Sequence, residues 1–241
     1  DSVSFAYPEA GENVLTDISF KAKKGQTIAV IGSTGSGKST LINLIPRYYD
    51  VTKGSVKVDG VDVRDMTQKE LRDKLGYVPQ KGVLFSGTID SNIRYGKPEI
   101  TDAQVKEAAE VAQATEFIDT KPEKYESPVS QGGTNVSGGQ KQRLSIARAI
   151  AKDPEIFIFD DSFSALDFKT DSQLRKALKE YTKDATTVIV AQRISTILGA
   201  DQIIVLDDGH MAGIGTHKEL MANCEVYQQI ARSQLSEEEL A

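Results

Sequence analysis

Four short apolar runs constrain the fold more than any other feature of the sequence. Each is four residues long and rich in β-branched or aromatic residues, and they occupy Ile28–Ile31, Ile156–Phe159, Val188–Ala191 and Ile203–Leu206. Long amphipathic stretches separate them. Buried parallel strands covered by helices on both faces have this pattern, whereas a membrane-spanning helix needs about 20 successive apolar residues. The runs therefore predict an α/β fold with a mostly parallel sheet, and no helix that crosses a membrane.

Alternating residues predict a smaller antiparallel part near the start of the chain. Val14–Lys21 alternates apolar and polar residues, and Ser55–Val63 alternates around the turn Asp59-Gly60. Period-two alternation is typical of half-buried strands, and an Asp-Gly turn between two such runs is typical of a hairpin. We expect the N-terminal third to hold a mixed sheet beside the parallel core.

The middle of the chain predicts helices. Thr101 and Ser137 each begin a capping-box sequence, with Gln three residues later. An apolar pattern at helical spacing follows each of them. Residues from about 82 to 145 are therefore expected to form a helical insertion between parallel strands, with a polar loop at 126–135. Further helices are predicted at Phe168–Tyr181 and His217–Ser233.

Composition excludes several classes of protein. Asp and Glu outnumber Lys and Arg by 35 to 29, for a net charge of −6. This balance argues against a broad nucleic-acid surface, which needs clustered basic residues. A single cysteine, Cys224 in the predicted C-terminal helix, excludes an intramolecular disulfide framework and indicates a reducing compartment. His210 and His217 alone do not make a metal site.

A glycine-rich segment follows the first apolar run and precedes an apolar helix pattern. Its residues are Gly32, Ser33, Thr34, Gly35, Ser36, Gly37, Lys38, Ser39 and Thr40. Strand, glycine-rich loop and helix are the context of a phosphate-binding P-loop, in which backbone N–H groups surround an anion. Lys38 would reach the β- and γ-phosphates, and the Ser39 hydroxyl would coordinate Mg²⁺. The segment predicts a nucleotide site.

An acidic residue ends the second apolar run. Asp160 follows Ile156–Phe159 directly. An acid at the carboxyl end of a buried parallel strand lies where open α/β sheets bind ligands. Beside a P-loop, Asp160 is therefore expected to contact the Mg²⁺ ion, directly or through water.

With these motifs and Val136-Ser137-Gly138-Gly139-Gln140 ahead of a basic helix, the sequence resembles the nucleotide-binding domain of an ABC transporter. The motifs follow the family's order over nearly the whole chain. Tyr7 resembles the adenine-stacking aromatic residue, and Gln80 the glutamine that senses Mg²⁺ and the membrane domains. Ser164-Ala165-Leu166-Asp167 resembles the D-loop. Leu84–Arg94 is similar to the segment of multidrug-type exporters.

The resemblance implies an ATPase core with an antiparallel β-subdomain (1–81 and 146–241) and a helical subdomain (about 82–145). It implies ATP and Mg²⁺ as cofactors, with Ser39, Gln80 and Asp160 at the metal. A second nucleotide-binding domain would pair head to tail, so that Ser137, Gly138, Gly139 and Gln140 act on the partner's ATP. Transmembrane domains would dock through coupling helices at the cytoplasmic side of a membrane. Because the chain begins at Asp1 without an initiator Met, we expect those spans to precede it.

Two positions depart from the family's pattern. Asp161 stands where the family has the glutamate that activates the attacking water, and Gln192 stands where it has a histidine near the γ-phosphate. Gln131 also replaces a glutamate that is common in exporters. An aspartate is one methylene shorter, and a general base must come within about 2.6–3.2 Å of its proton donor. An amide carries no titrating proton. These changes predict the degenerate-site half of a heterodimeric exporter, with slow hydrolysis at its own site.

Two other functions stay open on the residues alone. A soluble ABC ATPase of the DNA-repair or translation class would share the P-loop and the signature, but it should carry a basic face and a coiled-coil insertion or a second cassette. A regulatory module that only binds ATP would fit the two departures. Tyr48 and Tyr49 are expected to serve packing at the surface, or else to line the groove for a coupling helix.

Overall fold

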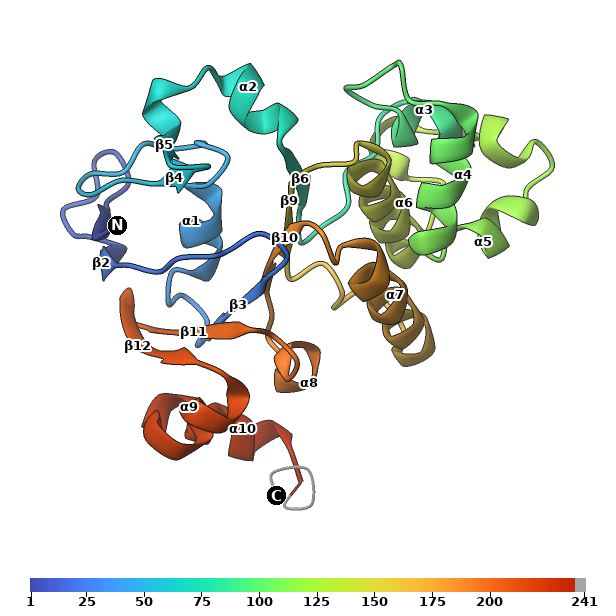
Figure 1. Ribbon diagram of the computed structural model, residues 1–241. Helices are drawn as coiled ribbons and strands as arrows, with labels where there is room; N and C mark the ends of the chain where they lie inside the picture. The colour runs from blue at the N-terminus through green and yellow to red at the C-terminus, as the bar shows by residue number, and fades with distance from the viewer. Residues whose placement is uncertain (237–241) are drawn as a thin grey trace. The chain divides into compact units, whose positions relative to one another are not determined.

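The chain divides into two compact units (Figure 1). The first unit joins Asp1–Leu75 to Thr186–Ala241, and the second is Gly76–Ala185. The computed structural model describes residues 1–236. Among those residues, no helix is both long enough and apolar enough to cross a membrane.

The sheet of the first unit contains three of the four predicted apolar runs. Its strands lie in the order β12, β11, β3, β10, with bounds His210–Gly215, Gln202–Asp207, Thr27–Gly32 and Thr186–Val190. β3 pairs in parallel with both β10 and β11, and β12 pairs antiparallel with β11. Ile28, Val30 and Ile204 are fully buried. The predicted α/β class with a mixed, mostly parallel sheet is confirmed, because each apolar run is a buried strand.

The predicted antiparallel part is also present in the first unit. β1 (Val3–Phe5) pairs with β2 (Leu15–Ile18), and β4 (Lys57–Val58) pairs with β5 (Val61–Asp62). The turn between β4 and β5 takes positive φ at both Asp59 (52°) and Gly60 (81°), which suits a two-residue hairpin. The paired part of the hairpin is shorter than the expected 55–63, because a 3₁₀ turn, η1, starts at Val63.

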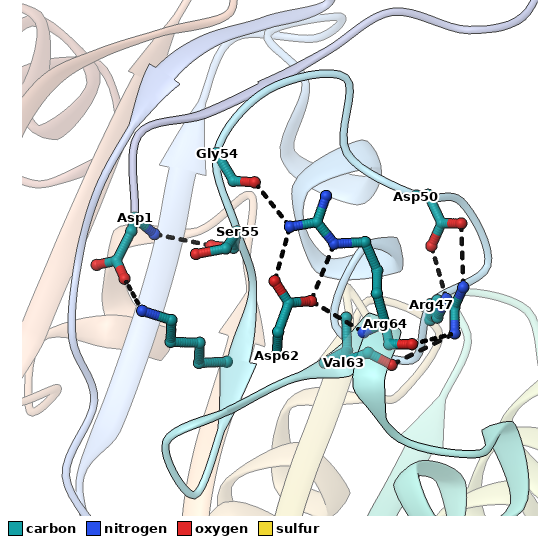
Figure 2. A network of polar contacts seen from close by, with 9 residues as sticks. Asp1, Arg47, Asp50, Gly54, Ser55, Asp62, Val63 and Arg64 are labelled. Carbon is teal, nitrogen blue, oxygen red and sulfur yellow. Dashed lines mark hydrogen bonds and ion pairs between the residues drawn. The ribbon is translucent and has the colours of Figure 1, made fainter.

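Hydrogen bonds from two arginines to backbone carbonyls hold this hairpin to the segment after the first helix (Figure 2). Arg64 donates to both carboxylate oxygens of Asp62, and to the carbonyl of Gly54 at 3.1 Å. Arg47 binds Asp50 and also donates to the Arg64 carbonyl. The hairpin, too short to be stable alone, is thus fastened by charged side chains on both of its flanks.

The helices of the first unit are short. They are α1 (Lys38–Asn43), α2 (Gln68–Asp73), α8 (Ile194–Ile197), α9 (His217–Asn223) and α10 (Glu225–Gln234). The expected helix over 217–233 is therefore two helices, and the expectation that Cys224 is helical is wrong. Cys224 has extended backbone and is 5% exposed, because its side chain packs into the core beside Gly213. The acidic end of the sequence, from position 237 on, lies outside the described residues.

The second unit carries the remaining strands and helices. Strand β9 (Ile156–Asp160) lies beside β6 (Leu75–Val78), whose first residue belongs to the first unit, and β7 (Gly87–Thr88) pairs with β8 (Pro128–Val129). The helices are α3 (Ile89–Ile93), α4 (Asp102–Val111), α5 (Thr115–Asp119), α6 (Gly138–Ala151) and α7 (Phe168–Tyr181). The loop expected at 126–135 contains β8 and the 3₁₀ turn η3 (Gln131–Gly133), and another such turn, η2 (Lys124–Glu126), precedes it.

Both predicted capping boxes are confirmed in this second unit. Thr101 begins α4 and Ser137 begins α6, each with its reciprocal Gln contact. The helix at Phe168–Tyr181 has the predicted bounds and starts from the side-chain cap of Asp167. Local sequence signals therefore set these helix starts, since each cap satisfies backbone N–H groups that the helix itself leaves unpaired.

Candidate functional site

The glycine-rich segment forms the predicted strand, loop and helix. β3 ends at Gly32 and α1 begins at Lys38. Gly35 and Gly37 take φ values of 83° and 97°, which side chains rarely adopt. The Lys38 ammonium lies over the loop and donates to the carbonyls of Gly32 (2.8 Å) and Ser33 (2.6 Å). An anion bound by this loop would therefore meet a cation already positioned there.

Neighbouring atoms crowd two of the loop's glycines, a backbone carbonyl at one and a leucine side chain at the other. A Cβ at Gly32 would lie 2.1 Å from the carbonyl oxygen of Leu206 in β11, and a Cβ at Gly37 would lie 2.7 Å from Leu15 in β2. The N–H of Gly209, in the turn after β11, also donates to the Ser36 carbonyl at 3.3 Å. The loop is thus supported from two sides by segments distant in the sequence.

Tyr7 lies beside the end of this loop. Its hydroxyl is 2.9 Å from Thr40 Oγ1, and its ring makes edge contacts with Phe5 and Tyr49 at centroid distances of 4.9 and 5.1 Å. The ring is half-buried. The structure therefore brings Tyr7 to the end of the phosphate loop. It adds Tyr49, which the sequence alone did not place there.

Gln192 lies at the same edge of the first unit's sheet. Val190 in β10 pairs with Val30 in β3, and the Ala191 N–H donates to the Val30 carbonyl. Continuing this register by two residues aligns Gln192 with Gly32, where the phosphate loop begins. The carboxyl ends of parallel strands form the ligand-binding edge of such sheets, and Gln192 follows one of these ends.

The acidic residues lie at the end of β9 in the second unit. Asp160 and Asp161 are each 8% exposed. Tyr77 Oη lies 3.5 Å from Asp160 Oδ2, and Gln80 Nε2 donates to Asp161 Oδ2 at 3.1 Å. The Ser164 hydroxyl donates to the Asp161 carbonyl at 3.0 Å. Gln80 and the atypical Asp161 are therefore in direct contact, which the sequence did not predict.

The signature residues begin α6. Ser137 Oγ accepts from the Gln140 N–H at 3.2 Å, and Gln140 Oε1 accepts from the Ser137 N–H at 3.1 Å. Gly138, which is exposed, and Gly139, which is half-buried, form the first turn between them, without side chains that would shield its N–H groups. A Cβ at Gly139 would meet the Ala165 carbonyl at 3.5 Å, so the signature and the D-loop segment lie next to each other.

Arg143 holds the signature helix to its neighbours in the second unit. Its guanidinium donates to the Gln113 carbonyl at 2.7 Å and lies 4.7 Å from the centre of the Phe117 ring. Burial lowers the pKa of Arg143 from its usual value. The position of the glycine turn is therefore set by a half-buried cation as well as by the capping box.

The candidate metal ligands are all oxygen donors. Ser39 offers a hydroxyl, Gln80 an amide oxygen and Asp160 a carboxylate. Such hard donors suit Mg²⁺, which keeps several waters and needs few protein ligands. In residues 1–236, no group of three or more His, Cys, Asp or Glu side chains that could hold a metal is found. The donor chemistry therefore fits Mg²⁺ held together with a nucleotide.

Comparisons with a family model and with known proteins all lead to ABC transporters. The family model described as ABC transporter matches residues 15–164. An uncharacterized ABC transporter ATP-binding protein of Mycobacterium tuberculosis is 50% identical over 96% of this chain, and a Staphylococcus aureus protein named as a multidrug export ATP-binding/permease protein is 46% identical over 95%. The chain spans about 40% of the length of each of these relatives.

A solved structure agrees at the level of the fold. The structure of a bacterial Atm1-family ABC exporter with ATP bound superposes with a TM-score of 0.94 at 38% identity. The superposition covers 98% of this chain and 42% of that one. Taken with the phosphate loop, the acidic strand and the signature helix, these matches show that the chain belongs to the ABC transporter family, as an ATP-binding domain.

Proposed function

We propose that this chain is the motor domain of an ABC exporter of the multidrug type. It binds Mg-ATP, pairs head to tail with a second nucleotide-binding domain and drives export through transmembrane domains at the cytoplasmic side of a membrane. The observation that carries the proposal is the phosphate loop of the first unit, with Lys38 held across it. A second helix start, exposed at Gly138, is the surface that a neighbouring ATP would use.

ATP binding follows from the geometry of the first unit. The N–H groups of residues 33–40 surround the phosphates, and the ammonium of Lys38 leaves the loop carbonyls for the β- and γ-phosphate oxygens. The ring of Tyr7 stacks on adenine while its hydroxyl stays on Thr40. The amide of Gln192 donates to the γ-phosphate.

For Mg²⁺ we propose Ser39, Gln80 and Asp160 as the protein's oxygen donors, with the ion neutralising phosphate charge.

Hydrolysis at this chain's own site is proposed to be slow. Asp161 is the residue that would take a proton from the attacking water, but its carboxylate accepts a hydrogen bond from Gln80 and is one methylene shorter than a glutamate. A misplacement of about 1 Å in a reacting group costs on the order of 10²-fold in rate. Gln192 donates a hydrogen bond but cannot transfer a proton at neutral pH. ATP is therefore held for long periods.

The signature is proposed to complete the partner's site. Ser137, Gly138, Gly139 and Gln140 present a helix start whose dipole and N–H groups favour an anion. The D-loop, Ser164 to Asp167, lies beside Gly139 and would share that interface. The partner would supply the P-loop and the catalytic glutamate of the competent site.

An exposed aromatic surface of the second unit supports a further partner. Tyr95 is 55% exposed and stacks on Phe85 at a centroid distance of 4.1 Å, beside Val83, which is 51% exposed. Arg148 lies against both rings and donates to the Val83 carbonyl at 2.9 Å. We propose that this surface, rather than Tyr48 and Tyr49, receives a coupling helix of the transmembrane domains, since Tyr49 packs on Tyr7.

Domain organisation completes the proposal. The ATPase core with its β-subdomain is proposed to comprise residues 1–81 and 146–241, and the helical subdomain residues from about 82 to 145. The helices α3, α4 and α5 and the first turns of α6 fall in the latter range. The transmembrane domains are proposed to belong to the same transporter.

Single-turnover hydrolysis in the assembled transporter tests the degenerate site. The partner's catalytic glutamate is replaced by glutamine, and ATP cleavage is followed with this chain unchanged, or carrying Asp161→Glu with Gln192→His. We expect almost no fast cleavage with the unchanged chain and at least a tenfold gain with the double variant. Fast cleavage by the unchanged chain would refute the proposed impairment. A regulatory ATP-binding module would show no partner-dependent turnover at all.

A further inference from the structure

The C-terminal helix α10 makes two hydrogen bonds to the loop that carries Gln192. The side-chain amide of Gln234 donates through Nε2 to the Gln192 carbonyl at 2.8 Å, and its Oε1 accepts from the Ile194 N–H at 2.8 Å. One planar amide therefore joins both ends of the three-residue segment Gln192–Ile194. Both contacts lie within the first unit.

The geometry of α10 explains why Gln234 reaches this loop. Tyr227 and Ala231 are fully buried on the same helix, in the cluster that also contains Ile194. Gln234 follows Tyr227 by seven residues and Ala231 by three, so it continues the same helix face. The buried stripe of α10 thus aims the amide at the start of α8.

The backbone N–H at the start of α8 takes its hydrogen-bond acceptor from outside the loop. Arg193 occupies the N-cap position of this four-residue helix and makes no side-chain cap hydrogen bond. The first N–H groups of a helix have no acceptor within the helix, so they need a capping side chain or another acceptor. Gln234 Oε1 supplies the acceptor for the Ile194 N–H and so replaces the missing cap from 40 residues away.

Gln192 is held on its other side by the sheet. Ala191 is buried, and its N–H donates to the Val30 carbonyl of β3 at 3.2 Å. The backbone at Gln192 thus lies between an anchor on β3 and an anchor on α10, at the edge of the sheet where the strand register aligns this residue with Gly32. Rotation of the Gln192 peptide would break the bond to Gln234.

We propose that Gln234 is a positioning residue for nucleotide recognition, which holds the Gln192 backbone so that the Gln192 amide faces the γ-phosphate. The inference rests on the proposed function, because it takes the γ-phosphate contact of Gln192 from there. It adds that discrimination between ATP and ADP depends on a helix that itself touches no nucleotide. Gln234 is exposed, so water competes for its bonds and the effect of losing them is moderate.

The test compares Gln234→Met with Gln229→Met in the full 241-residue chain. Methionine keeps the length and the helix propensity of glutamine but removes both hydrogen bonds. Gln229 is exposed on the same helix. Among the described residues, its amide contacts Glu225, one turn earlier on that helix, at 3.4 Å. Dissociation constants for Mg-ATP and Mg-ADP are measured by calorimetry for each variant.

We expect Gln234→Met to weaken ATP binding by about threefold to tenfold, the value of one or two moderate hydrogen bonds, with ADP binding unchanged. Gln229→Met should change neither constant. Gln234→Glu should behave like Gln234→Met, because a carboxylate accepts from Ile194 but cannot donate to the Gln192 carbonyl. Adding Gln192→Ala to Gln234→Met should give no loss beyond that of Gln192→Ala alone.

Two results would overturn the proposal. They differ in whether the proposed γ-phosphate contact of Gln192 is refuted together with the role of Gln234. If Gln192→Ala weakens ATP binding selectively while Gln234→Met does not, or weakens ATP and ADP equally, the positioning role fails and the proposed nucleotide site stands. If Gln192→Ala leaves the ratio of ATP to ADP affinity unchanged, the γ-phosphate role of Gln192 fails as well.

Discussion

At the scale of single residues, the phosphate loop contains two glycines that separate the effect of steric crowding from that of backbone conformation. Gly35 and Gly37 both have positive φ, but a Cβ at Gly35 has no atom within 4 Å, whereas a Cβ at Gly37 is 2.7 Å from Leu15. The two glycines therefore carry the same conformational requirement and differ in packing. This difference separates the two physical effects.

Replacement of these glycines by alanine is expected to have unequal effects. Gly35→Ala carries the cost of positive φ alone, about 1–2 kcal/mol of unfolding free energy. Gly37→Ala adds overpacking against Leu15, typically a further 1–3 kcal/mol. Urea unfolding of both variants beside the parent chain measures the difference. Equal losses would show that Leu15 moves aside without cost.

At the scale of elements, two capping boxes of the same form have different expected roles. Thr101 caps α4 and Ser137 caps α6, each by accepting from the N–H of a Gln three residues on. Both caps should stabilise their helices by about 1 kcal/mol. Only the start of α6 is proposed to meet a nucleotide.

Alanine at the two caps tests that distinction. Thr101→Ala and Ser137→Ala should each lower the free energy of unfolding by about 0.5–2 kcal/mol. In the assembled transporter, Ser137→Ala should also lower partner-dependent ATP turnover by at least tenfold, because the variant lacks the hydroxyl that is proposed to contact the partner's ATP. Comparable turnover in both variants would argue that the signature serves stability only.

The β4–β5 hairpin illustrates how charge supports a small element. Arg64 hydrogen-bonds the carboxylate of Asp62 and holds the pKa of Asp62 down at about 2 (Figure 2). Because this pKa lies below the value of about 3.9 for an unfolded chain, the stabilisation is complete above about pH 5 and is lost as the pH falls toward 2. Asp62 also caps the 3₁₀ turn η1 by accepting from the Arg64 N–H.

Asp62→Asn should expose this pH dependence, because asparagine keeps the cap but removes the charge. The parent should exceed the variant in unfolding free energy by on the order of 1–2 kcal/mol at pH 7, allowing for the partial exposure of Arg64. That difference should shrink to about half by pH 3. Urea titrations at several pH values measure it, and a difference independent of pH would mean that the ion pair adds no stability.

At the scale of the whole molecule, nucleotide binding and folding are linked. A ligand that binds only the folded chain stabilises it by about 2.7 kcal/mol at one hundred times its dissociation constant. Mg-ATP should therefore raise the melting temperature of the parent chain. Lys38→Ala should abolish that rise, because the loop loses the cation that now lies over Gly32 and Ser33. An equal rise in Lys38→Ala would place ATP elsewhere.

Much of the architecture could be predicted from local sequence. The four apolar runs became buried strands, and the caps at Thr101 and Ser137 became helix starts, because burial and N-capping act over a few residues. The prediction failed at Cys224, where apolar spacing continued through a break. That break depends on the packing of the Cys224 side chain against Gly213, a residue of β12 that local spacing does not represent.

The sequence by itself determined the chemistry of this protein: a phosphate loop, an acidic strand end and a signature, since these motifs need particular residue types at fixed spacing. Only the tertiary structure decided which residues support them. Leu206 and Leu15 close around the loop's glycines, Gln80 binds Asp161, and Gln234 holds the Gln192 backbone. Each of these contacts joins residues more than 20 positions apart, so it depends on how strands and helices pack and not on any local pattern.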